Sequence, residues 1–444
     1  MLRTLILIVA LTATQASAVM ANDQAAKRLE MAKALVAHLA AGEFDRAIEP
    51  FDPTMKRVMP AAKLKEVWSG LTTQYGPLER ATETRIVKTK RYEFVFVTCE
   101  FHWWKLDAKV VFDADNLVTG LFFVPSGKYK PPSYADPAKF EEKALSIGSA
   151  PWSLPGTLLL PKGEGPFPAV VLVHGSGPND RDETLGPNKP FRDLASGLAS
   201  RGIAVLRYEK RTKQYPLAMS LLANSITVKA ETVDDATAAV DALAACEKID
   251  RQRIYVLGHS LGGSLIPRIA TANHRIAGFI SLAGSTRPLE DVILEQTRYI
   301  LSLDGKISAG EQKQLDELAQ QVARVKSPEL SAKTGNKALP LGVPVPYWID
   351  LRGYDPAEAA VAVKRPLLIL QGERDYQVTM EDFGRWKKAL AARKDVTFIS
   401  YPALNHLFIA GKGPGSPAEY STQGNVAEKV VLDIAQWIKG QHAD

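Results

Sequence analysis

The sequence predicts an α/β chain: a mostly parallel sheet with helices on both faces and an inserted helical cap, preceded by a small N-terminal α+β domain. Three observations predict this class. From Phe140 onward, apolar runs of strand length alternate with amphipathic segments. One connection, residues 285–365, is too long for a plain crossover between two neighbouring strands. Ahead of both, helical periodicity up to Tyr75 gives way to a period of two.

The composition is that of an ordinary globular protein. The chain has 444 residues, of which 46% are hydrophobic and 23% are charged. These values exclude a disordered, collagen-like or coiled-coil chain. The net charge is +6, from 55 Lys+Arg against 49 Asp+Glu. Because the positive charges are dispersed along the chain, we expect no nucleic-acid partner.

The N-terminus has the pattern of a cleaved signal peptide, residues 1–18. Arg3 supplies the positive charge, Leu5 to Ala13 form a short apolar core, and Ala16-Ser17-Ala18 is an A-x-A cleavage site. The apolar core is shorter than the roughly 20 residues that a membrane span needs. No cysteine follows it that could carry a lipid anchor. We therefore expect a periplasmic or secreted protein with no membrane span after signal cleavage.

Residues 23–125 are predicted to form the N-terminal α+β domain. The segment 25–41 carries apolar residues at helical spacing, and two further helices are expected at 43–51 and 61–75. The later part alternates with period two, which predicts strands at 82–88, 92–104, 109–112 and 117–124. Residues 113–116 then form a hairpin turn. Several prolines in residues 126–139 predict a semi-rigid linker to the rest of the chain.

Residues 140–444 are predicted to form the α/β domain. Strands are expected at 157–160, 169–173, 203–206, 254–257, 278–282, 367–370 and 396–400. The run 169–173 is apolar throughout, as a strand buried on both faces should be. The cap insertion, 285–365, is expected to hold helices at 289–303 and 311–325, followed by an aromatic, proline-rich stretch at 344–355.

The sharpest local signal is Gly258-His259-Ser260-Leu261-Gly262-Gly263, which directly follows an apolar strand and precedes a helical pattern. This is G-x-S-x-G in a strand–turn–helix setting. The glycines are expected because side chains at these positions of a tight turn would clash with the neighbouring strand and helix. Ser260 is therefore predicted to be a nucleophile held above the edge of the sheet.

A second glycine-containing loop, His174 to Pro178, follows the buried strand 169–173. Attack on a carbonyl develops negative charge on its oxygen, and two backbone N–H groups can stabilise that charge by several kcal/mol. We assign this oxyanion hole to the amides of Leu261 and Ser176, with Gly177 as an alternative donor in the loop. The loop lacks the spacing of a phosphate-binding motif, so a nucleotide site is not expected.

A serine nucleophile needs a base, and the base needs an orienting carboxylate. The sequence has seven histidines, of which five lie in the N-terminal domain, the C-terminal tail or the two glycine-containing loops. His274 lies beyond the helix that follows Ser260, so His406 is the remaining candidate. It follows the last predicted strand by a few residues. For the acid we choose Asp375, in the loop after strand 367–370, with Glu373 as the alternative. Sites in open α/β sheets form at the carboxyl ends of strands.

These motifs resemble those of the α/β-hydrolase superfamily, with the nucleophile–acid–base order Ser260, Asp375, His406. The stretches 174–184 and 347–351 further resemble a group of bacterial serine esterases that carry an extra N-terminal domain of unknown function. The N-terminal unit here is similar to that domain, and to cystatin-like or nuclear-transport-factor-like folds. The resemblance implies a carboxylesterase acting on short acyl chains without a cofactor. Dienelactone hydrolases carry Cys at the nucleophile position, so Ser260 argues against that branch.

The cap is expected to supply the substrate pocket, because pockets are mostly apolar and aromatic. Its candidate lining residues are Tyr347, Trp348 and Tyr354, although these residues could instead pack the cap onto the sheet. The expected partner is a small-molecule ester, and a homo-oligomer stays open. Two alternative functions also stay open: a thioesterase or peptidase/amidase using the same triad, and a non-catalytic binding protein on the same fold.

The two cysteines, Cys99 and Cys246, are expected to be buried, free thiols. Cys99 and His102 form a C-x-x-H pair, but only two ligands are visible and strand alternation places them on opposite faces. No metal site is therefore predicted.

Overall fold

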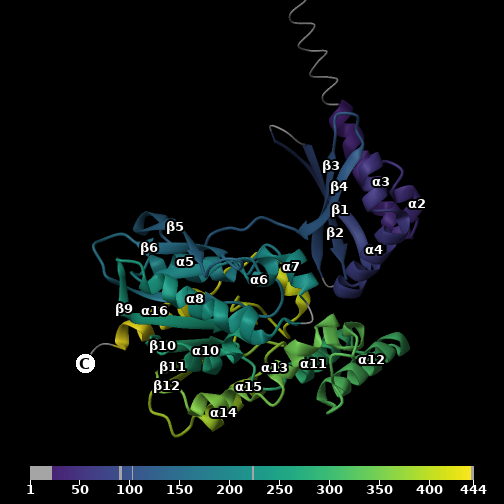
Figure 1. Cartoon of the computed structure of the whole chain (residues 1–444). Coiled ribbons are helices and arrows are strands. Elements are labelled where there is room, and N and C mark those ends of the chain that lie inside the picture. Colours follow the sequence, from purple (N-terminus) through teal and green to yellow (C-terminus); the bar gives the residue numbers. More distant parts are fainter. Residues whose placement is uncertain (1–22, 90–92, 103, 223–224, 442–444) are drawn as a thin grey trace, which may run out of the picture. The chain divides into compact units, whose positions relative to one another are not determined.

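The computed structural model describes residues 23–89, 93–102, 104–222 and 225–441 (Figure 1). The expected signal peptide, residues 1–18, lies outside these ranges. The described chain separates into two compact units: the residues up to Lys128 together with Tyr420–Gln423, and Tyr129–Glu419 together with the residues from Gly424 onward. In the interval predicted as a linker, the only regular element is a short 3₁₀ turn, η1 (Pro137–Lys139).

The first unit is a four-stranded antiparallel sheet with helices against one of its faces (Figure 1). Its strands pair in chain order: β1 (Leu78–Lys88), β2 (Glu93–Phe101), β3 (Lys105–Phe112) and β4 (Val118–Pro125). Its helices are a helix at 23–41, α2 (Phe44–Ala47), α3 (Pro53–Val58) and α4 (Ala61–Tyr75). One apolar core joins the helices to the sheet.

Two details of this unit differ from the sequence expectation. The helix expected at 43–51 is shorter, and α3 was not predicted. Asp52 caps α3 by accepting a hydrogen bond from the backbone N–H of Met55, and Pro53 occupies the first turn, where no N–H is needed. The first and third strands also begin earlier than expected, at Leu78 and Lys105.

The second unit contains an eight-stranded sheet in the order β12-β11-β10-β9-β7-β8-β6-β5. All pairs from β12 to β8 are parallel, whereas β6 and β5 are antiparallel additions at one edge. The strands are β5 (Phe140–Ile147), β6 (Leu154–Pro161), β7 (Phe167–Val173), β8 (Ala204–Tyr208), β9 (Ile249–His259), β10 (Gly278–Leu282), β11 (Leu367–Gly372) and β12 (Val396–Tyr401). The sequence reading did not identify β5, which is a largely exposed edge strand.

Helices cover both faces of this sheet, which gives it two separate apolar cores. On one face lie α5 (Pro190–Ala199) and α16 (Glu428–Gly440). On the other lie α8 (Asp234–Ala244), α10 (Ile266–Ala272) and α15 (Met380–Ala389). Because the central strands are buried on both faces, their apolar runs are continuous, as the run 169–173 predicted.

The predicted cap interval, between β10 and β11, is largely helical. It contains α11 (Leu289–Leu301), α12 (Ala309–Lys326), α13 (Val345–Leu351) and α14 (Pro356–Val361), with the short 3₁₀ turns η4 (Asn336–Ala338) and η5 (Pro340–Gly342) between them. Helix α12 begins with a capping box formed by Ser308 and Glu311. The cap has a small apolar core of its own, which includes Trp348.

Two further observations concern the whole described chain. Within the ranges given above, no helix combines the length and the hydropathy needed to cross a bilayer. Both cysteines are free thiols, as expected, but only Cys99 is buried, and Cys246 is half-buried. Burial raises the pKa of the Cys99 thiol to about 12, so it stays protonated near neutral pH.

Candidate active site

Ser260 lies on a sharp turn between strand β9 and the short helix α9 (Leu261–Ser264). Its φ of 52° places a non-glycine residue in the left-handed region, a strain that typically costs about 1–3 kcal/mol and clusters at functional sites. A Cβ added to Gly258 would lie 2.2 Å from the carbonyl oxygen of Gly262, and one added to Gly262 would lie 2.4 Å from that of Val173. The motif glycines are therefore required by backbone crowding around the nucleophile.

The predicted acid and base lie in loops that follow two other strands of the same sheet. Asp375 follows β11, and His406 follows β12. His406 Nδ1 and Asp375 Oδ2 are 2.6 Å apart, and both side chains are buried. Glu373, the alternative acid, instead accepts a hydrogen bond from Ser400 Oγ at 2.8 Å. The structure therefore pairs His406 with Asp375, the first choice from the sequence.

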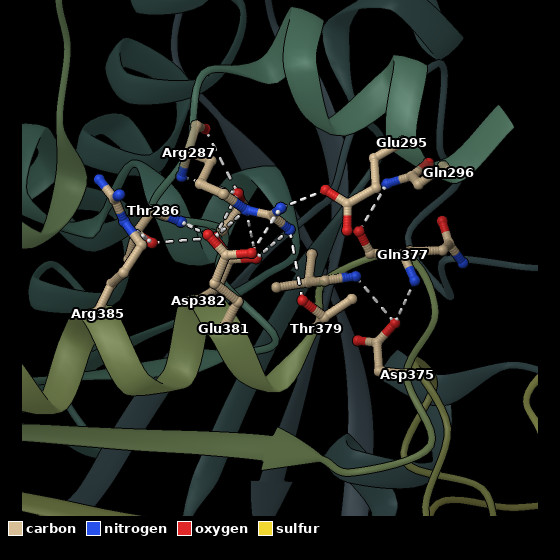
Figure 2. Close-up of polar contacts among 12 residues, drawn as sticks. Thr286, Arg287, Glu295, Gln296, Asp375, Gln377, Thr379, Glu381, Asp382 and Arg385 are labelled. Atoms are coloured by element: carbon tan, nitrogen blue, oxygen red, sulfur yellow. Dashed lines mark hydrogen bonds and ion pairs between the residues drawn. The ribbon is translucent and has the colours of Figure 1, made fainter. Parts of the chain in front are cut away.

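The second oxygen of Asp375 is held by its own loop. Asp375 Oδ1 accepts hydrogen bonds from the backbone N–H groups of Gln377, at 2.8 Å, and Val378, at 3.0 Å (Figure 2). The carbonyl of Gln377 in turn accepts a hydrogen bond from Gln296 Nε2, at 2.9 Å, on cap helix α11. The backbone thus fixes one oxygen of the carboxylate, while Oδ2 faces the imidazole and also accepts a hydrogen bond from Gln371 Nε2, at 3.2 Å.

An ionic cluster ties helix α15, which follows this loop, to the cap (Figure 2). Asp382, which is fully buried, accepts hydrogen bonds from the backbone N–H and hydroxyl of Thr286, and Arg287 pairs with it at 2.8 Å. Arg287 also contacts Glu295 on α11 and Glu381 beside Asp382. Since β10 leads into the cap through Thr286 and Arg287, this cluster anchors the start of the cap to helix α15.

Ser260 and His406 line one small cavity of about 130 Å³. Among the residues that the structure describes, no hydrogen bond joins Ser260 Oγ to His406. Catalytic hydrogen bonds are often long in free enzymes and tighten only when substrate is bound. The structure thus brings the three side chains to the carboxyl edge of the sheet, with the Asp–His contact formed and the Ser–His contact open.

The two predicted oxyanion donors, Ser176 and Leu261, both line the larger pocket that Ser260 also lines. Within the described ranges, neither backbone N–H donates to a protein acceptor. Gly177, the alternative loop donor, lines the same pocket. Unpaired N–H groups beside a strained serine are what an oxyanion hole requires.

The larger pocket has a volume of about 660 Å³ and opens onto Ser260. The three predicted aromatic residues all line it, and their polar atoms are satisfied within the protein. Tyr347 donates to Glu231, Tyr354 donates to the carbonyl of Ser264, and Trp348 Nε1 donates to the carbonyl of Val343. Their aromatic rings can therefore form part of the apolar wall of the pocket. Trp348 also belongs to the apolar core of the cap, so this residue both lines the pocket and packs within the cap.

A second wall of this pocket was not predicted from the sequence. It is formed by the segment that follows β8, with α6 (Arg211–Gln214), α7 (Pro216–Leu221) and the residues after them. Its apolar members in the pocket are Pro216, Met219 and Ile226. This segment carries no motif, and its helices are too short to give a clear periodicity, so no sequence signal distinguished it.

A buried ion pair next to the triad was also missed. His259 Nδ1 lies 2.9 Å from Glu183 Oε2, at an angle unlike that of a hydrogen bond, and His259 Nε2 lies 2.9 Å from the carbonyl oxygen of His406. Burial alone would lower the pKa of His259, but the charge of Glu183 outweighs it and raises the pKa above its usual value. Burial alone would raise the pKa of Glu183, but the charge of His259 outweighs it and lowers the pKa below its usual value. The charge of Glu183 therefore favours an imidazolium at His259, whose Nε2 faces the carbonyl oxygen of His406.

Comparisons with known proteins agree with this architecture. A family model described as the alpha/beta hydrolase family matches residues 170–414, and one described as a protein of unknown function (DUF3887) matches residues 32–121. The curated protein esterase EstD of Thermotoga maritima is 38% identical over 405 residues, which cover 91% of this chain and 93% of that protein.

Two solved structures are more distant. Est1E from Butyrivibrio proteoclasticus is 17% identical, with a TM-score of 0.43 over 68% of this chain and 99% of its own. An esterase from Pyrococcus furiosus is 16% identical, with a TM-score of 0.44 over 71% of this chain and 98% of its own. Neither likeness bears on the assignment. Because the alpha/beta hydrolase family model spans more than half of the chain, the chain belongs to the α/β-hydrolase family.

Proposed function

We propose that the protein is a serine carboxylesterase in which Ser260 is the nucleophile, His406 the general base and Asp375 the carboxylate that orients the base. The observation that carries the proposal is the buried 2.6 Å contact between His406 Nδ1 and Asp375 Oδ2, beside a cavity that Ser260 also lines. The similarity to an esterase along nearly the whole chain supports ester bonds as the target.

The reaction follows from this geometry. Ser260 Oγ attacks the ester carbonyl carbon while His406 Nε2 takes its proton, and Asp375 stabilises the imidazolium that forms. The amides of Leu261 and Ser176 donate hydrogen bonds to the tetrahedral oxyanion. Collapse breaks the carbon–oxygen bond to the alcohol, which leaves with the proton from His406. A water molecule, deprotonated by His406, then attacks the acyl-serine, and the second collapse releases the carboxylic acid and reprotonates Ser260.

We place the acyl or alcohol group of the substrate in the larger pocket, against Tyr347, Trp348 and Tyr354. Its volume of about 660 Å³ lies in the range of pockets that hold drug-sized ligands, so volume alone would admit more than a short acyl chain. The preference for short chains, inferred from sequence resemblance, is tested by a series of p-nitrophenyl esters of increasing acyl length. An unchanged length profile in a folded Trp348→Ala variant would remove Trp348 from the pocket role.

The assignment of the nucleophile is tested with a fluorophosphonate, which reacts covalently with activated serines. Mass spectrometry should find one adduct, on Ser260, and Ser260→Ala should abolish both the adduct and ester hydrolysis. The matched control is Ser220→Ala, because Ser220 lies on the wall of the same pocket but in a different segment. Labelling of another residue, or none, would refute the mechanism. A parallel panel of thioesters and amides should be hydrolysed more slowly than the matching esters.

We further propose that the protein is exported, on the strength of the signal-peptide pattern in residues 1–18. Intact-mass measurement of protein secreted or recovered from a periplasmic fraction should show an N-terminus at Val19. Full-length protein retained in the cytoplasm would contradict this proposal.

A further inference from the structure

Lys210 is a buried cation beside the oxyanion loop that the proposed reaction does not use. It lies two residues beyond β8 and is 2% exposed. Its Nζ donates a hydrogen bond to the carbonyl oxygen of Gly175, at 2.8 Å, and lies 3.5 Å from Glu231 Oε2. Burying an ammonium and a carboxylate is expensive, and well-packed apolar residues often stabilise a fold as well or better. Stability alone therefore does not account for this buried pair.

The hydrogen bond from Lys210 falls on the peptide group that contains the proposed oxyanion donor. The carbonyl of Gly175 and the N–H of Ser176 belong to one planar trans peptide, so they point in opposite directions. Fixing the oxygen on the Lys210 side directs the N–H away from Lys210, toward the pocket that Ser176 and Ser260 line. A cation on the oxygen also polarises the peptide, which strengthens its N–H as a donor.

Two other side chains that the structure describes, Asn179 and Glu183, restrain the same loop. Asn179 Nδ2 donates to the carbonyls of Gly175, at 3.2 Å, and Ser176, at 3.0 Å, but its side chain is only half-buried. Glu183 Oε1 accepts a hydrogen bond from the N–H of Gly175 at 2.7 Å. A buried charged side chain therefore fixes each of the two peptide groups that flank Gly175. Glu183 accepts a hydrogen bond from the N–H of the first, and Lys210 donates one to the carbonyl of the second.

The position of Lys210 is itself held from the pocket wall. Glu231 lies in a short π-helical turn, η3 (Lys229–Val233), and is 5% exposed. Its other contacts are with Thr212 Oγ1, at 2.9 Å, and the hydroxyl of Tyr347, at 3.2 Å. A continuous polar path therefore runs from the cap residue Tyr347 through Glu231 and Lys210 to the carbonyl of Gly175.

We propose that Lys210 is a positioning residue, which orients the Gly175–Ser176 peptide so that the Ser176 N–H meets the oxyanion, and that Glu231 holds Lys210 in place. This inference rests on the proposed serine esterase mechanism. It distinguishes Lys210 from an ordinary buried ion pair, because its loss should weaken binding of the tetrahedral state and leave binding of the planar ester nearly unchanged.

The test compares Lys210→Met with the parent enzyme and with Lys213→Met, which removes the same charge from an exposed position three residues away. Titration with a fluorophosphonate first gives the concentration of active sites, so that unfolded protein does not count. The turnover number per titrated site should then fall about 10- to 100-fold in Lys210→Met, less than or close to the effect of deleting an oxyanion donor outright. The KM should stay within about threefold, and Lys213→Met should behave as the parent.

A trifluoromethyl ketone provides the decisive measurement, because it forms a tetrahedral adduct with an oxyanion. Its inhibition constant in Lys210→Met should rise by about the same factor as the turnover number falls. A turnover number per site within threefold of the parent would overturn the inference, as would an unchanged inhibition constant. If Lys210→Met does not fold, Asn179→Ala removes a half-exposed donor to the same carbonyl, and it should show the same paired changes at a smaller size. In Asn179→Ala, a change in the turnover number without a matching change in the inhibition constant, or the reverse, would also overturn the inference.

The two proposals fail in different ways. If the esterase mechanism is wrong, the parent enzyme itself will not be labelled at Ser260. If only the role of Lys210 is wrong, the parent will be labelled and inhibited by the ketone, while Lys210→Met will match it.

Discussion

The ion pair between Glu183 and His259 offers the sharpest test of how this site is held together. Glu183→Gln preserves the shape of the side chain and removes its charge. In the parent, His259 faces an acceptor at each ring nitrogen: Glu183 Oε2 at Nδ1 and the carbonyl of His406 at Nε2. In the variant, either a buried imidazolium lacks its counter-ion, or the ring loses its charge and with it the ionic attraction to residue 183.

The magnitude follows from burial. Both side chains are less than a tenth exposed, and removing one partner of a buried ion pair typically costs about 3–5 kcal/mol. We therefore expect Glu183→Gln to lower the free energy of unfolding by about 3 kcal/mol or more near pH 6. The matched control is Glu373→Gln, since Glu373 is exposed and its side chain accepts a hydrogen bond from Ser400, and a surface change of this kind should stay within about 0.5 kcal/mol.

The two pKa shifts determine the pH range in which the ion pair stabilises the fold. The pKa of His259 is raised above 6.5 in the folded state, so its contribution is complete below that pH and is lost as the pH rises through the folded pKa. The pKa of Glu183 is lowered below 4.5, so its contribution is present above that value and is lost as the pH falls through the folded pKa. The pair should therefore stabilise the fold most between about pH 4.5 and 6.5.

Urea unfolding at pH 5.5, 7 and 9 measures this directly. The difference in unfolding free energy between the parent and Glu183→Gln should be largest at pH 5.5 and should shrink toward pH 9. A difference that is constant or grows with pH would refute the assignment of an imidazolium at His259. A difference below about 1 kcal/mol at every pH would show that the pair is not a stabilising contact.

Three further predictions concern Asp375, the glycine-containing turn around Ser260, and the buried His174. Asp375→Asn should lower the turnover number by about 10³- to 10⁴-fold in ester hydrolysis assays with little change in KM, because an amide cannot hold the required tautomer of His406; a loss below tenfold would contradict its role. Gly262→Ala should abolish soluble expression or activity, since its Cβ would lie 2.4 Å from the carbonyl of Val173, whereas Gly384→Ala, where no atom lies within 4 Å, should raise the melting temperature. Burial lowers the pKa of His174 to about 4, so the parent should lose about 3 kcal/mol of stability as the pH falls from 7 to 4, a loss that urea unfolding should find absent in His174→Asn.

Sequence patterns were sufficient to bring the three residues of the proposed triad together, because each of them follows a strand of a parallel sheet. The apolar runs predict the strands, and their carboxyl ends meet at one edge, so Ser260, Asp375 and His406 converge without any further assumption. The glycines around Ser260 carried the same information, because their positions reflect backbone crowding that the structure shows at Gly258 and Gly262. The edge strand β5 was missed because its side chains are mostly exposed and its sequence, with Glu141, Glu142 and Lys143, lacks an apolar run.

The supporting charges could not be predicted in the same way. The short helices α6 and α7 lie between Lys210 and Glu231 in the chain. Glu183 lies in the irregular loop after β7. Each sits in a polar stretch of sequence, where a charged residue is ordinarily solvated. Only the folded structure shows that these side chains point inward, because ion pairing depends on tertiary approach and leaves no periodicity along the chain.

The nature of the oxyanion loop explains why buried charges are used there. A loop that must approach the reacting carbonyl closely has small residues, and Gly175 has no side chain with which to restrain its own backbone. An oxyanion hole stabilises charge efficiently only when its donors are already oriented, because any reorientation during the reaction subtracts from the gain. The restraint must therefore come from outside the loop and must act on the peptide groups themselves. Glu183 on the N–H and Lys210 on the carbonyl meet that need, which apolar packing could not, since only a charged or polar side chain can select one orientation of a peptide over its flipped alternative.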